Sequence, residues 1–243
     1  MKIYFAGSIS RKIIEPFAVD IYRLQSFVDF KGRRSENIVF KDFILDSGAF
    51  TFMRNCRLND IDWNKYIDEY AIFIKKHNIQ NYIELDIDSI IGVPETERLR
   101  YFLEKKVGRR CIPVWHVQRG YDKWIELCKN YEYICIGGFV TKEIKESHYP
   151  IITKLINDAN KNNCRVHGLG FTNFKWLPRL HFYSVDSSSF LSGSRYGHVS
   201  MFNGESITNI DFPIGKMLKN SQALRSHNLQ EWVKFSRYAE IKL

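Results

Sequence analysis

The sequence predicts one α/β domain over residues 1–243, folded as a (β/α)8 barrel of the TIM type, and three observations support this prediction. A length of 243 residues with 44% hydrophobic content is sufficient to bury the core of a barrel. Short apolar runs of strand length alternate with stretches of helical periodicity along the chain. The apolar runs are continuous, which is typical of parallel strands buried on both faces, and no linker rich in Pro, Gly or Ser divides them.

Seven apolar runs predict strands, in chain order Lys2–Gly7, Phe43–Ser47, Tyr82–Asp88, Cys111–Val117, Tyr133–Gly137, Arg165–Gly168 and Phe182–Asp186. A weaker candidate at His198–Phe202 brings the number to about eight. An open doubly wound sheet would show the same alternation of strands and helices. Polar residues at the ends of many of these strands favour the barrel.

The clearest predicted helix is Trp63–Lys76, in which apolar residues recur at helical spacing. Asp62 is placed to cap this helix, and Pro94 fits the first turn of the next one. Further helices are predicted at Glu95–Lys106, Tyr121–Lys129, Tyr149–Asn162 and Gln230–Tyr238. The long segment Ser10–Lys41 is predicted to be a basic insertion after the first strand, serving as a lid or a nucleic-acid contact. Its basic residues are Arg11, Lys12, Arg23, Lys31, Arg33 and Arg34.

The net charge of +9 indicates a polyanionic partner such as nucleic acid, although a surface rich in solvated Lys would give the same number. The excess is concentrated late in the chain, where residues 161–243 hold 11 Lys and Arg against 5 Asp and Glu. We therefore expect nucleic-acid contacts from Lys175, Arg179 and Arg195. Lys216, Lys219 and Arg225 are further basic residues of this region.

The five cysteines are scattered, and no pair has Cys-x-x-Cys spacing, so the sequence predicts neither a disulfide framework nor a metal site. Several lie in apolar runs, where free Cys behaves as a small buried hydrophobe. The first residues are too short an apolar run for a signal peptide, and no window reaches the length of a membrane span. We therefore expect a cytoplasmic protein without a cofactor.

Two strand ends carry carboxylates that could perform chemistry. Asp46 and Asp186 each end an apolar run, and ligands of α/β barrels bind beyond the carboxyl ends of the strands. Such a pair suits acid/base chemistry combined with nucleophilic attack, as in glycosyl transfer. Taken singly, an Asp here is more often a helix cap, a His structural and a Gly a turn residue. The other strand-end residues are Ser47, Asp86, Asp88, His116, Gln118, Gly137, Gly138, His167, Gly168 and Ser187.

The order of the strand-end motifs resembles the tRNA-guanine transglycosylase superfamily. Ile44 to Phe50 resembles its Asp-Ser-Gly-Gly-Phe/Tyr signature, and Glu84-Leu85-Asp86 falls where the family has its base-recognition Phe-Asp. The remaining matches are Val117 to Gly120 with Val-Gln-Gly, Ile134 to Gly138 with Ala-Ile-Gly-Gly, Val166 to Gly170 with Met-Gly-Val-Gly, and Val185-Asp186-Ser187 with Phe-Asp-Cys. Together these six motifs run in family order from about Phe43 to Ser189.

The resemblance implies a role for each matched residue. Asp186 would be the nucleophile that forms a covalent glycosyl intermediate, and Asp46 the general acid/base. Asp86 would accept hydrogen bonds from the N1–H and amine of a guanine-like base. The other implied base-binding residues are Ser47, Gln118, Gly137 and Gly138, with Phe50 and His167 on the two faces of the base.

The chain departs from the tRNA enzymes in ways that bear on its substrate. It is much shorter, and no Cys follows Cys164, so the family's zinc site of three Cys and one His is absent. Ala49 and Ser187 also differ from the usual residues. These features resemble the compact branch of phages and bacterial modification islands, which replaces guanine in DNA with 7-deazaguanine derivatives such as 7-cyano-7-deazaguanine. If the chain is phage-encoded, it would act in the host cytoplasm.

Three other functions remain open from the sequence. One is base exchange on tRNA with a reduced recognition surface. Another is a barrel glycoside hydrolase with Asp46 and Asp186 as its carboxylate pair. The last is a barrel that only binds nucleic acid, in which the carboxylates are helix caps.

Overall fold

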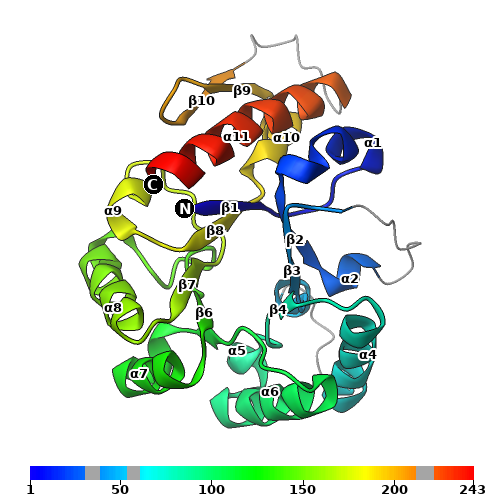
Figure 1. Ribbon diagram of the computed structural model, residues 1–243, viewed down its shortest axis with the longest axis vertical. Coiled ribbons are helices and arrows are strands. Elements are labelled where there is room, and N and C mark those ends of the chain that lie inside the picture. Colours follow the sequence, from blue (N-terminus) through cyan, green and yellow to red (C-terminus); the bar gives the residue numbers. More distant parts are fainter. Residues whose placement is uncertain (31–38, 54–60, 212–221) are drawn as a thin grey trace.

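The protein is an α/β fold in which eight parallel strands form one curled sheet with helices around its outside (Figure 1). The computed structural model describes residues 1–30, 39–53, 61–211 and 222–243. The strands are β1 Lys2–Phe5, β2 Tyr22–Ser26, β3 Asp42–Asp46, β4 Asn81–Tyr82, β5 Val114–Trp115, β6 Tyr133–Ile136, β7 Arg165–Gly168 and β8 Ser184–Ser187. Their order in the sheet is β4-β3-β2-β1-β8-β7-β6-β5.

The first and last strands in this order, β4 and β5, contact each other through residues that flank them, Ile83 after β4 and Ile112 before β5. Ile83 and Ile112 form a parallel bridge. The amide of Ile112 donates to the carbonyl of Tyr82 at 2.8 Å, and the amide of Glu84 donates to the carbonyl of Ile112 at 3.0 Å. These hydrogen bonds connect the sheet around its full circumference, as in a TIM-like barrel.

Strand β2 lies inside the segment that the sequence predicted to be an insertion, so this prediction was wrong for residues 22–26. The strand pairs in parallel with both β1 and β3, with Leu24 beside Ile44. Its Arg23 is only 2% exposed and donates to the carbonyls of Phe5 and Gly7, each at 2.6 Å, so it is no nucleic-acid contact. The alternation of Tyr, Arg, Leu and Gln in this strand conceals it from a search for continuous apolar runs. Lys31, Arg33 and Arg34 lie outside the described residues.

The weaker strand candidate is a strand, but it does not belong to the barrel. His198–Phe202 forms β9, which pairs antiparallel with β10 Ile207–Asp211 in a separate two-stranded sheet. Along the chain, this hairpin comes between β8 and the last helix, α11 Gln222–Lys242. In space, α11 lies between the hairpin and the barrel and packs against β9 and β1 (Figure 1). The N-terminal amine of Met1 donates to the carbonyl of Ala239 in α11 at 2.9 Å, so the two ends of the chain meet there.

Four of the predicted helices are present with small differences at their ends, whereas the helix predicted at Gln230–Tyr238 is the middle of the much longer α11. The longer ones are α4 Trp63–Lys76, α6 Val93–Val107, α7 Gly120–Asn130 and α8 Tyr149–Lys161. Asp62 caps α4 by accepting from the amide of Lys65 at 3.0 Å, and Pro94 lies in the first turn of α6, both as predicted. The short helices are α1 Arg11–Ile14, α2 Phe27–Phe30, α3 Ala49–Met53, α5 Asp88–Ile91, α9 Leu177–Leu180 and α10 Gly193–Tyr196. Short 3₁₀ helices occupy η1 Glu15–Asp20, η2 Val117–Arg119, η3 Glu146–His148 and η4 Ser189–Leu191.

The core has an inner and an outer part. Inside the barrel lies a cluster formed by alternate residues of the strands, whereas larger clusters fill the space between strands and helices. The inner cluster includes Tyr4, Tyr22, Leu24, Ile44, Ile83, Val114, Tyr133 and Cys135. As expected, Cys111, Cys128, Cys135 and Cys164 are free and buried, while Cys56 lies outside the described residues. Over the described part of the chain, no helix combines the length and apolar character needed to cross a membrane.

Candidate active site

A cavity of about 570 Å³ opens at the carboxyl ends of the strands. Each of the eight strands contributes a residue at its end or in the loop that follows. In chain order these are Gly7, Ser26, Asp46, Asp86, His116, Gly137, Gly170 and Asp186. The cavity is therefore formed by the whole rim of the barrel, which is where ligands of such barrels bind.

Seven of the nine residues that the sequence predicted for catalysis and base binding line this cavity. They are Asp46, Phe50, Asp86, Gln118, Gly137, Gly138 and Asp186. Ser47 and His167 do not line it, and both side chains are fully buried. Phe50 lies in the first turn of α3 and is 48% exposed, so its ring offers a flat apolar wall at the cavity.

Asp46 is the last residue of β3 and has a strongly perturbed environment. Burial raises the pKa of its carboxyl from 3.8 to about 7, opposed by the amide of Gly48, which donates to Oδ2 at 3.0 Å. The negative charges of Asp186, Asp86 and Asp29 raise this pKa further. A carboxyl with a pKa near neutrality can both donate and accept a proton, which is the property of a general acid/base.

Asp186 lies in β8, and two nitrogen atoms contact the same oxygen of its carboxylate. The amide of Gly170 donates to Oδ1 at 2.6 Å, and Nε2 of His167 lies 3.2 Å from the same oxygen. The side chain of Asp186 is 11% exposed. His167 therefore lies beneath Asp186, inside the barrel, and not on the face of a bound base as the resemblance implied.

A second pair of side chains, Asp86 and His116, faces the cavity from the segments that follow β4 and β5. Nε2 of His116 lies 2.9 and 3.0 Å from the two carboxylate oxygens of Asp86, and its Nδ1 lies 3.4 Å from Glu143 Oε2. Burial by itself would lower the pKa of His116, but the hydrogen bond and charge of Asp86, aided by Asp88 and Glu143, raise it to about 9. A Cβ on Gly137 would lie 2.5 Å from His116 Cε1, so only glycine leaves room for this ring.

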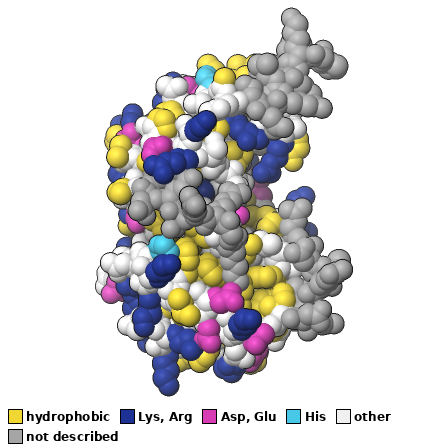
Figure 2. Space-filling model, turned by 90° about the vertical axis from the view of Figure 1, so that its right-hand side faces the viewer, with side chains coloured by type: hydrophobic (Ala, Val, Ile, Leu, Met, Phe, Trp, Pro, Cys, Tyr) yellow, Lys and Arg dark blue, Asp and Glu magenta, His cyan; other side chains and the backbone are white. Residues whose placement is uncertain are grey.

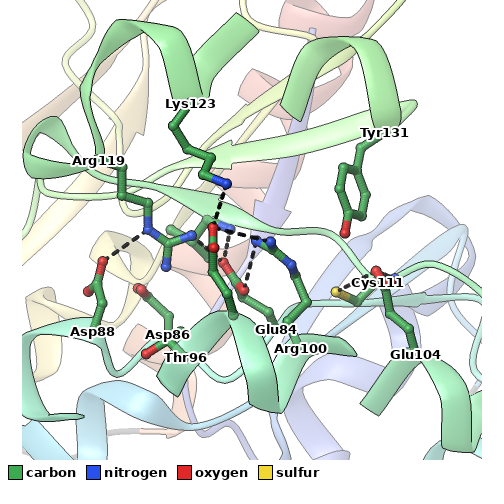
Figure 3. A network of polar contacts seen from close by, with 12 residues as sticks. Glu84, Asp86, Asp88, Thr96, Arg100, Glu104, Cys111, Arg119, Lys123 and Tyr131 are labelled. Atoms are coloured by element: carbon green, nitrogen blue, oxygen red, sulfur yellow. Dashed lines mark hydrogen bonds and ion pairs between the residues drawn. The ribbon is translucent and has the colours of Figure 1, made fainter. Parts of the chain in front are cut away.

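Behind this pair lies a network of buried charges (Figure 3). Arg119 donates to Asp88 Oδ2 at 3.0 Å and to Glu84 Oε1 at 3.1 Å, and Figure 3 shows its guanidinium between the two carboxylates. Glu84 also accepts from the amide of Val114 at 2.6 Å and pairs with Arg100 at 3.4 Å. Burial raises the pKa of Glu84, against the opposing effect of both Arg charges. This network fixes the loop after β4 that carries Asp86.

Asp86, Asp88 and His116 also offer one ligand atom each within 4.8 Å of one another, which is close enough to hold a metal ion. Carboxylate oxygens and an imidazole nitrogen suit a divalent cation. However, Asp88 is already paired with Arg119, and Asp86 with His116. A cation would have to displace Arg119 from Asp88 and take the place of the proton that His116 shares with Asp86, so these residues are better explained as an ion-pair network.

The basic residues predicted to contact nucleic acid lie outside the cavity lining. Lys175 pairs with Glu146 at 2.9 Å, and the guanidinium carbon of Arg179 lies 5.2 Å from the centre of the Trp176 ring. Arg195 is exposed on α10. Figure 2 shows Lys and Arg spread over one face among acidic and hydrophobic side chains, so charge alone does not delimit an interface. Lys216 and Lys219 lie outside the described residues.

Sequence reasoning assigned no role to two acidic residues of the cavity, Asp29 and Glu143. Asp29 belongs to α2, in the segment that was expected to be an insertion. Glu143 lies in the loop after β6, with no motif around it. His116 and Asp88 stand out as strand-end residues, but no single motif indicates their partners.

The fold and the cavity define a TIM-like α/β barrel with an acidic cavity at the carboxyl ends of its strands. Neither a scan against protein-family models nor a search of curated proteins found a match to this chain.

Proposed function

We propose that the protein is a pentosyltransferase that replaces guanine in DNA with a 7-deazaguanine base such as 7-cyano-7-deazaguanine, through a covalent Asp186–glycosyl intermediate. One observation carries the proposal. Asp46 and Asp186 line the same cavity from the ends of β3 and β8, yet Asp46 has a pKa near neutrality and Asp186 is held by two N–H donors. Carboxylates in contrasting environments are typical of paired acid and nucleophile.

The proposed reaction needs both carboxylates in turn. Asp186 attacks the sugar C1′ and forms an ester bond while the glycosidic bond breaks. The leaving guanine takes the electron pair of that bond and a proton from Asp46. The incoming base then returns its proton to Asp46 and displaces Asp186. No high-energy cofactor is required, since the ester to C1′ conserves the energy of the broken glycosidic bond until the incoming base forms the new one.

The cavity has the size and polarity that a purine needs. A volume of about 570 Å³ lies in the usual range for small-molecule sites. Phe50 supplies an apolar wall, and Gln118 together with the backbone of Gly137 and Gly138 supplies polar groups. Asp86, held by the positive His116, is suited to accept from the N1–H and exocyclic amine of a guanine-like base.

Entry of a DNA base requires that it leave the stack, at a cost of a few kcal/mol that phosphate contacts must offset. The cavity itself carries carboxylates, so the phosphates must be bound outside it. The net charge of +9 supplies that attraction over the rest of the surface. We expect binding to weaken steeply with added salt, and Lys175→Ala, Arg179→Ala and Arg195→Ala to reduce the salt dependence. Affinity that is constant over 50–200 mM salt, a range in which about 6–10 phosphate contacts would weaken binding strongly, would contradict this.

The test is exchange of labelled guanine and labelled 7-cyano-7-deazaguanine into duplex DNA and, in parallel, into unmodified tRNA. Asp186→Asn is the loss variant, and Asp122→Asn on the exposed first turn of α7 is the matched control. Label entering DNA with the wild type and Asp122→Asn, but not with Asp186→Asn, would support the proposal. Label in tRNA alone would keep the mechanism and change the substrate. Hydrolysis of a glycoside without base exchange, or no reaction, would overturn it.

A further inference from the structure

A chain of buried polar groups extends from Asp186 into the barrel, and the proposed reaction invokes only its first member, His167. The hydroxyl of Tyr133 in β6 lies 2.5 Å from Ser184 Oγ in β8, which lies 2.6 Å from His167 Nδ1 in β7. The other ring nitrogen, Nε2, reaches Asp186 Oδ1 at 3.2 Å. His167 and Ser184 are direct neighbours in the sheet, so the strand register itself brings them together.

With Asp186 ionised and His167 neutral, the chemistry of these groups sets the direction of every hydrogen bond. An ionised carboxylate only accepts, so Nε2 of His167 must carry the hydrogen. In the neutral imidazole Nδ1 then accepts, which makes the Ser184 hydroxyl its donor. Ser184 Oγ can in turn accept from Tyr133, whose phenol keeps its proton because burial raises its pKa. All three donors therefore point along the chain toward Asp186.

The two oxygens of Asp186 differ as a result. Oδ1 accepts from His167 and from the amide of Gly170, whereas no group in the described ranges 1–30, 39–53, 61–211 and 222–243 donates to Oδ2. Asp186 lines the cavity, so its partly exposed side chain can present Oδ2 there. Gly170 is held at φ +67°, and a Cβ at this position would lie 2.2 Å from Val140 Cγ2, so a glycine favours this amide geometry.

We propose that His167, supported by Ser184 and Tyr133, is a positioning residue that holds Oδ1 of Asp186 and leaves Oδ2 as the atom that attacks the sugar. This inference rests on the proposed function, since it names the attacking oxygen of the same reaction. The new bond joins Oδ2 to C1′ as the bond from C1′ to the base breaks, and Asp46 supplies the proton that the base carries away. Holding one oxygen fixes the carboxylate plane and so the approach to C1′.

The test compares two substitutions of His167 that fill similar space. His167→Gln keeps an N–H donor near the position of Nε2, whereas His167→Met keeps the bulk without a donor. In single-turnover reactions with saturating DNA, we expect His167→Met to slow formation of the covalent adduct on the order of 100-fold, with His167→Gln much closer to the wild type. KM for DNA should stay unchanged in both. Equal losses in the two variants, or a change confined to KM, would overturn the positioning role.

A readout independent of activity separates this inference from the proposed function. Nitrogen NMR of the folded protein should report His167 with hydrogen on Nε2, and Ser184→Ala should shift that tautomer balance while Tyr133→Phe shifts it less. Hydrogen on Nδ1 in the wild type would overturn the chain even if base exchange occurs. Absence of base exchange in the wild type would instead overturn the proposed function and the attacking role of Oδ2, whatever the tautomer.

Discussion

The two sides of the cavity hold their carboxylates in different ways. On the β8 side, Asp186 is bound by an amide and by an imidazole that ends a chain of hydroxyl groups. On the β4–β5 side, Asp86 and Asp88 are bound by the cations of His116 and Arg119. Asp46 lies in β3 with the amide of Gly48 as its donor and other carboxylates close enough to raise its pKa.

Under the proposed function, this difference would let one type of side chain serve three purposes. N–H donors from a rigid strand and loop fix the geometry of Asp186 without cancelling its charge. Ion pairs fix Asp86 and neutralise much of its charge, which suits recognition of a neutral base. Burial among like charges makes Asp46 the carboxyl that changes protonation near neutral pH.

The largest expected effect comes from removing the charge on each side in turn. Asp186→Asn should lower base exchange by about 10⁴-fold or more and abolish the covalent adduct, because a carboxamide is a poor nucleophile. Asp86→Asn should still form the adduct but lose its preference for guanine-like over other bases, since a carboxylate that accepts two N–H groups is replaced by an amide. The measurement is trapping of the adduct on a denaturing gel with defined DNA. Equal loss of adduct in both variants would remove the distinction between the two sides.

The next effect concerns stability. Arg119→Met should lower the free energy of unfolding by about 3–5 kcal/mol, because it leaves Glu84 and Asp88 as buried charges with fewer partners. Ser184→Ala on the other side removes a neutral hydroxyl and should cost only about 1–3 kcal/mol. Urea unfolding monitored by circular dichroism measures both. A larger cost for Ser184→Ala would reverse the comparison.

Asp46 gives a pH-dependent prediction whose sign follows from its raised pKa. The folded state holds this proton up to about pH 7 and the unfolded state only to about 3.8, so the contribution to stability is lost as pH rises through that window. The side chain of Asp46→Asn does not titrate, so the free energy of unfolding of this variant does not fall in this way. Relative to the wild type, it should rise by on the order of 2 kcal/mol between pH 5 and pH 8. Thermal unfolding at both pH values measures it. A constant difference would mean that Asp46 titrates normally.

The smallest effect concerns the ion pair of His116. Its protonated form contributes stability in full below about 6.5, and this contribution is lost as pH rises through about 9. Asp86→Asn removes the main partner and should lower the pKa of His116 by at least one unit, which NMR of the ring proton can follow. Ser184→Ala serves as the control because it acts on the other side and should leave this titration unchanged.

The sequence by itself predicted much of this fold and the location of the cavity. Continuous apolar runs marked seven of the eight barrel strands, because strands buried on both faces must be apolar along their length. Polar residues that directly follow such runs had to lie on one rim, which brought Asp46, Asp86 and Asp186 to a single cavity. Strand β2 escaped this reasoning, because Arg23 and Gln25 interrupt its apolar character.

Only the tertiary structure decided what each carboxylate touches. His167 and Asp186 are 19 residues apart, and His116 and Asp86 are 30 apart, so neither contact follows from local spacing. The register between β7 and β8 places Ser184 beside His167, and the missing Cβ of Gly137 admits the ring of His116. Sequence periodicity determines which face of the sheet a residue occupies. Its hydrogen bonds and its pKa depend on distances of a few ångströms to residues on other strands, and closure of the barrel sets these distances.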